Sequence, residues 1–138
     1  MASCGNDGKV NIFGFWESTN DQIVEFNKPI ISIELESNFS RSFSFLTGDT
    51  RLILNKPRHT RHIIHDNEGI ISNIKWCQNL IAWSNQKGVK IYSTAKKEII
   101  ISIINDYDEN FLDDYRCILL WSEPYTLSIL NILKVNLN

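Results

Sequence analysis

An all-β fold of repeated four-stranded units is predicted by three features of this 138-residue sequence. One short pattern recurs, made of a small apolar strand, a tight turn of Gly, Asp or Asn, and an alternating strand. It is clearest at residues 1–13, 45–54 and 81–92, with a degenerate copy at 127–135. The matched positions Val10, Leu52, Val89 and Leu133 lie 42, 37 and 44 residues apart, and helical periodicity is nearly absent. A repeat of about 40 residues with paired short strands is typical of a WD40-type β-propeller, one blade per repeat.

The strands of the first two blades are predicted from short β-branched and apolar runs bounded by turn residues. The first blade should hold strands at residues 2–5, 9–15 and 22–26, with Asp7 and Gly8 in its first hairpin turn. The second should hold strands at 30–35, 42–47, 51–55 and 62–65, with a turn at 48–50. Gly8 is expected to need a positive φ, and Asp7 and Asp49 to accept hydrogen bonds from nearby backbone amides. Asp7 and Asp49 are not expected to form a catalytic pair, because equivalent positions of successive blades do not converge.

The third blade is the most regular, with strands at residues 70–76, 80–84, 89–92 and 98–104. The fourth begins at 117–121 and ends with a strand at 133–137. The predicted blade pieces are therefore residues 1–27, 29–66, 69–104 and 116–138, and residues 105–115 form an acidic surface loop. The first piece lacks its first strand and the fourth its last. Because a closed ring needs about four to eight blades, we expect about three and a half blades of a larger, partial propeller.

Composition excludes several classes of function. A formal net charge of −2 gives no general attraction to nucleic acid or anionic membranes. The three cysteines form no CxxC pair, so we expect neither a zinc site nor a disulfide framework. No secretory signal is seen, and no apolar tract reaches the roughly 20 residues that span a bilayer. A nucleophile elbow, a phosphate loop and paired catalytic carboxylates are also missing. We therefore expect a cytoplasmic protein that is not an enzyme and holds no cofactor.

The tryptophans and one basic stretch are the remaining candidates for binding. Trp76, Trp83 and Trp121 alternate with Ile and Leu, which favours packing between blades over stacking on nucleic acid bases. The basic stretch is the densest positive patch, and it could meet an acidic partner or an anionic membrane surface. A metal site built from the histidines at 59, 62 and 65 is a weaker alternative, because neighbouring strand positions face opposite sides. The candidate partner-binding residues are Lys56, Arg58, Arg61 and His62.

A longer segment resembles a known family. HDNEG (residues 65–69) and IKW (74–76) are followed by LIAWSN (80–85) and GVKI (88–91). This order resembles the amino-terminal propeller of the vacuolar protein sorting-associated protein 41 family, which shows HEGEG, IKW, LIAWAN and GVKI at the same spacing. Residues 3–10 resemble the family's preceding blade, and residues 116–121 resemble the following one.

The resemblance implies a non-enzymatic scaffold, a subunit of the homotypic fusion and vacuole protein sorting (HOPS) tether in vesicle-mediated transport. The implied partners are other tethering-complex subunits and a Rab GTPase or adaptor complex of the late endosome. The implied location is peripheral, on late endosome, lysosome or vacuole membranes. The alternative is a WD-repeat scaffold of an unrelated complex in ubiquitin ligation or RNA processing. We also expect self-association, because residues 99–104 form an uncharged, β-branched edge strand.

Overall fold

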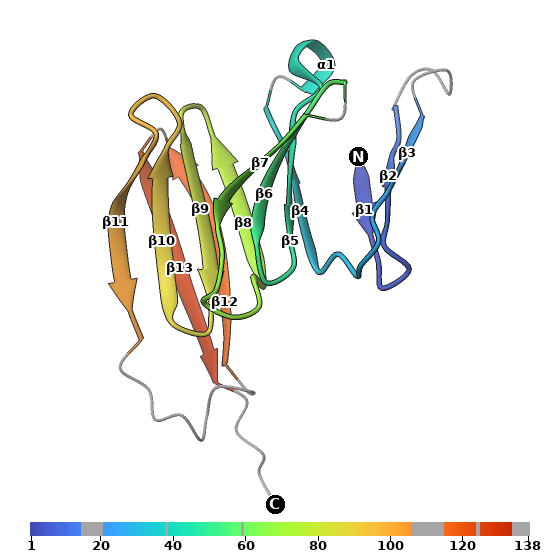
Figure 1. Cartoon of the computed structure of the whole chain (residues 1–138). Coiled ribbons are helices and arrows are strands. Elements are labelled where there is room, and N and C mark those ends of the chain that lie inside the picture. Colours follow the sequence, from blue (N-terminus) through green and yellow to red (C-terminus); the bar gives the residue numbers. More distant parts are fainter. Residues whose placement is uncertain (15–20, 38, 59, 106–114, 124, 134–138) are drawn as a thin grey trace, which may run out of the picture.

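Four antiparallel sheets follow one another along the chain in the computed structural model (Figure 1). The structure describes residues 1–14, 21–37, 39–58, 60–105, 115–123 and 125–133. In each sheet, successive strands of the chain pair with one another. The first two sheets contain β1 (Ala2–Cys4), β2 (Lys9–Ile12) and β3 (Gln22–Glu25), then β4 (Ser32–Leu35), β5 (Phe45–Gly48), β6 (Leu52–Lys56) and β7 (Thr60–His65). The third and fourth contain β8 (Asn73–Cys77), β9 (Leu80–Asn85), β10 (Gly88–Ser93) and β11 (Glu98–Ile104), then β12 (Tyr115–Glu123) and β13 (Thr126–Leu133).

The sheets stack face to face through the strands at one edge. β4 contacts β1 of the sheet before it and β8 of the sheet after it, and β8 contacts β12. The strands β3, β7 and β11 form the opposite edge of the first three sheets. Radial stacking of this kind is the arrangement of propeller blades. The structure therefore confirms the predicted all-β, partial propeller.

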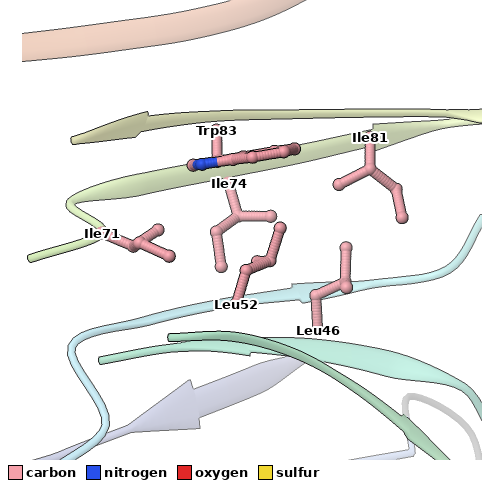
Figure 2. Close-up of a cluster of buried hydrophobic side chains, with 6 residues drawn as sticks. All are labelled: Leu46, Leu52, Ile71, Ile74, Ile81 and Trp83. Carbon is pink, nitrogen blue, oxygen red and sulfur yellow. The ribbon is translucent and has the colours of Figure 1, made fainter. Parts of the chain in front are cut away.

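Three apolar clusters fill the spaces between successive sheets. Because side chains alternate along a strand, each sheet gives one set of residues to each neighbour. Figure 2 shows the cluster between the second and third sheets, where Ile81 and Trp83 point toward Leu46 and Leu52. Ala82 lies between Ile81 and Trp83 in β9 and packs instead in the cluster with the fourth sheet. Trp83 is fully buried, and Trp76 and Trp121 pack against the clusters, which confirms their predicted role in the core.

Three hairpin turns use the same side-chain hydrogen bond. Asp7 Oδ1 accepts from the Lys9 amide at 3.0 Å, and Asp49 Oδ1 accepts from the Arg51 amide at 2.6 Å. Asn85 Oδ1 does the same for the amide of Lys87 at 2.9 Å. Each bond closes an Asx turn between two paired strands, so the turn role predicted for the two aspartates is confirmed.

Two details of the prediction are wrong, the start of the strand at residues 42–47 and the turn within residues 127–135. Residue 42 ends a single helical turn, α1 (Phe39–Ser42), and the strand begins only at Phe45. The Phe43 amide donates to Phe39 O, and the Ser44 amide to Ser42 Oγ, so local hydrogen bonds replace strand pairing here. The predicted turn near Asn131 is also absent, because β13 runs unbroken from Thr126 to Leu133 and pairs with β12 throughout.

The described residues include only part of the predicted fourth blade. Leu133 belongs to the second strand of the fourth sheet, so it is not the equivalent of Val89, which lies in a third strand. The acidic residues 106–114 and the predicted strand beyond Leu133 lie outside the described residues. The proposed limits of the blade pieces stay a prediction. Among the described segments, no helix is long and apolar enough to cross a membrane.

Candidate functional site

A cavity of about 390 Å³ opens between the first and second sheets, near their outer strands. Three cationic residues line it: Lys56, which ends β6, Arg58 in the turn that follows, and Arg61 on β7. Its apolar lining comes from both sheets and from the segment after α1. We call this site the basic groove, and its apolar residues are Val24, Phe43, Phe45 and Pro57.

Contacts across the groove fix the position of Arg61. Its guanidinium carbon lies 4.4 Å from the centre of the Phe26 ring, a cation–π contact. Its Nη2 also donates to the backbone oxygen of Glu25 at 3.5 Å. Both partners belong to the end of β3 and the residue after it. Arg61 therefore ties the outer strand of the second sheet to the outer strand of the first.

Asn55 makes the floor of the groove rigid. The side chain is 4% exposed, and its Nδ2 faces three oxygens, Thr47 Oγ1 at 3.0 Å, Ile53 O at 3.3 Å and Phe45 O at 3.4 Å. These acceptors settle which end of the amide is the nitrogen. They also fix β5 against β6 directly below the charged residues.

The structure brings three of the four predicted contact residues together and separates the fourth. His62 pairs with Leu54, which packs toward the third sheet, whereas Arg61 pairs with Asn55 on the groove side. Neighbouring residues of a strand point to opposite faces, so His62 lies on the other face of β7. The histidine at position 59 lies outside the described residues.

A second polar site, which the sequence analysis missed, surrounds Glu68. Its Oε2 bonds to His65 Nε2 at 3.0 Å, accepts from Asn85 Nδ2 at 3.4 Å and forms a close ion pair with Lys90. The His65 ring also lies 5.2 Å from the ring of Trp83. Burial alone would raise the pKa of Glu68. The hydrogen bond from Lys90 and the charges of His65 and Lys90, with a bond from Asn85, hold the pKa below its usual value.

The Glu68 site has the character of a structural brace. It joins the strand connection after β7 to β9 and β10, so it ties the second sheet to the third. The spacing of His65 and Glu68 could have suggested their contact, but nothing local in the sequence links them to Lys90. Within the described ranges, no three His, Cys, Asp or Glu side chains are grouped as metal ligands would be. The cysteines form no disulfide within the described ranges.

Comparison with known proteins identifies the family. A family model described as "Vps42 beta-propeller" matches residues 1–135. The vacuolar protein sorting-associated protein 41 homolog of Danio rerio is 38% identical over 133 residues, covering 91% of this chain and 15% of that protein. The Homo sapiens homolog is 36% identical over 135 residues, covering 94% of this chain and 16% of that protein. The Arabidopsis thaliana homolog is 30% identical over 110 residues, 75% of this chain and 11% of that protein. The chain thus spans about a sixth of its relatives' length or less, and it belongs to the β-propeller family of the vacuolar protein sorting-associated protein 41 proteins.

Proposed function

We propose that the protein acts as a subunit of the HOPS tether in vesicle-mediated transport to the late endosome, lysosome or vacuole. The observation that carries the proposal is the family match over residues 1–135, together with relatives named for vacuolar protein sorting. In this role the propeller is a rigid scaffold that recognises other proteins and catalyses no reaction. Its partners are other tether subunits and a Rab GTPase or adaptor complex, and it associates peripherally with the membranes that they occupy.

The packing of the sheets supports recognition through surface residues. The faces between sheets are filled by apolar side chains such as Leu46, Ile81 and Trp83, so little interior space is left for a ligand. The sequences of loops and outer strands can change without disturbing the packing between sheets. We therefore assign partner contact to exposed basic residues, with Lys56, Arg58 and Arg61 at the groove and His62 on the opposite face of β7.

Affinity purification of the tagged full-length protein from its own cells tests the proposed role. We expect the other subunits of the tether to co-purify in stoichiometric amounts. Recovery of ubiquitin-ligase subunits or RNA-processing factors in their place would support the alternative scaffold and refute the tether assignment. A parallel purification of an Arg58→Glu variant should recover the tether subunits but lose a partner that the basic residues contact. The difference between the variant and the native protein should be largest at low ionic strength and shrink as salt is added, because salt screens exposed charges.

A further inference from the structure

We propose that the basic groove binds an extended peptide segment in which acidic residues flank an apolar side chain. The inference rests on the proposed role as a protein-interaction module and adds the chemistry of one partner. The groove has a cationic rim and an apolar wall, and both are exposed to solvent. Phe43, in the apolar wall, is 42% exposed.

The cations of the groove lack carboxylate partners among the described residues. Elsewhere, ion pairs are formed by five described lysines and arginines: Lys9, Lys28, Arg51, Lys75 and Lys90. No ion pair within the described ranges involves Lys56, Arg58 or Arg61. Three positive charges around one cavity, none of them with a carboxylate partner in the described part of a chain whose net charge is −2, favour an anionic ligand.

The apolar wall distinguishes a peptide from a small anion. Phosphate or a lipid headgroup would use the positive rim and leave Phe43 and Pro57 in water. A peptide side chain placed against Val24, Phe43 and Pro57 removes apolar surface from water while its acidic neighbours reach the rim. The volume of about 390 Å³ lies in the range of ligand sites, which combine apolar walls with a few placed charges.

The groove is also held in shape before a ligand arrives. The three bonds of Asn55 fix its floor, and the contacts of Arg61 with Phe26 and the Glu25 oxygen fix its width. A preformed site loses less conformational entropy on binding, which favours capture of a short flexible segment.

Fluorescence anisotropy with the 138-residue chain tests the inference, with labelled acetyl-DEDFLDE-amide as the probe. Acetyl-DEDSSDE-amide keeps the charges without the apolar pair, and acetyl-KRKFLKR-amide reverses the charges. We expect the first peptide to bind at least about tenfold more tightly than either of the others. Equal binding of the two acidic peptides, or displacement by inorganic phosphate as effective as by unlabelled peptide, would make the groove a simple anion site. Stronger binding to phosphatidylserine vesicles than to the peptide would point to a membrane, and either result would overturn the proposal.

Charge reversal locates the binding site. Lys56→Glu/Arg58→Glu should weaken binding about tenfold, because it reverses two of the three positive charges of the rim. Among the described residues neither side chain forms an ion pair, so the fold should be little affected. The matched control Lys96→Glu/Lys97→Glu changes the net charge equally on exposed residues before β11 and should change binding less than about twofold. Phe43→Ala probes the apolar wall and should also weaken binding.

Thermal melting checks the fold of each variant, and Arg58→Gln replaces the double variant if that one does not fold. If Lys96→Glu/Lys97→Glu weakens peptide binding as much as Lys56→Glu/Arg58→Glu does, the peptide does not bind in the basic groove. Co-purification of tether subunits is independent of these measurements, so failure of the peptide proposal leaves the tether proposal standing.

Discussion

The first hairpin can be tested through Gly8→Ala, because its geometry leaves no room for a side chain. Gly8 has φ +73° and lies in the turn between β1 and β2. A Cβ built there would lie 2.3 Å from the backbone oxygen of Phe26 and 2.8 Å from that of Lys28. Both are main-chain atoms, so the segment after β3 would have to move.

Two energies contribute to the expected loss of stability. A non-glycine residue in the left-handed region costs about 1 kcal/mol. Moving the Phe26 oxygen away also disturbs the hydrogen bond from the Phe26 amide to Gly8 O, which is 2.7 Å long. Losing that bond costs about 1 kcal/mol, and residual strain brings the total to about 2–3 kcal/mol. For a chain of this length about 4 °C accompanies each kcal/mol, so the melting temperature should fall by about 8–12 °C.

Gly5→Ala is the matched control in the same turn. A Cβ at Gly5 would meet only the tip of Asp7 at 3.1 Å, and its φ is not in the left-handed region. We expect a change below about 1 kcal/mol, measured for both variants by circular dichroism melting and urea titration. Equal melting temperatures for Gly8→Ala and Gly5→Ala would refute the assignment of a left-handed turn at Gly8.

Three other predictions follow from the core, the Glu68 site and the outer edge. Trp83→Ala should lower the free energy of unfolding by about 3–5 kcal/mol in urea titration, because the ring is fully buried between the second and third sheets. A loss under about 1 kcal/mol would contradict that packing. The lowered pKa of Glu68 stabilises the fold above the usual glutamate pKa, and this contribution is lost as pH falls through the folded-state value. Between about pH 5 and pH 3, the free energy of unfolding of Glu68→Gln should therefore fall less steeply than that of the native chain. Equal slopes of the two stability curves would argue against the ion pair. Ile101 is 45% exposed at the centre of edge strand β11, so the native chain should self-associate in light scattering and Ile101→Lys should shift it toward monomer. A native chain that stays monomeric at high concentration would contradict this expectation.

The sequence predicts the third sheet best, because the local pattern and the packing there agree. The runs at 80–85 and 88–93 alternate between two buried faces, and the turn between them carries Asn85 in the same role as Asp7 and Asp49. The pattern fails where a polar segment has its own local bonds, as in α1 after Glu36. It also fails in β13, where an asparagine that resembles a turn residue simply continues the strand opposite Cys117.

The sequence predicted the charged residues of the candidate site but not its apolar wall. Lys56, Arg58 and Arg61 are close along the chain, and their charge marked them as exposed. The apolar wall comes partly from Val24 and Phe43, more than a dozen residues away along the chain, and no periodic signal links them to the basic turn. Likewise, Lys90 reaches Glu68 only because β10 lies beside β9 in the folded sheet. Contacts between residues that are far apart along the chain depend on how the strands and blades pack together. A repeat pattern within one blade does not encode that packing.

The position of the basic groove also suggests how a repeat protein separates folding from recognition. The inner hairpins reuse one turn, with Asp7, Asp49 and Asn85 bonded in the same way, because each must place its strands for packing against the next sheet. The turn between β6 and β7 lies toward the outer edge of its sheet, so it does not have to position strands for packing against the next sheet. It can therefore carry Lys56, Pro57 and Arg58, with Arg58 at φ +62°, without cost to the stacked cores. On this reasoning, substitutions at the three repeated turns should change stability first, whereas substitutions at the outer turn should change binding while the melting temperature stays nearly constant.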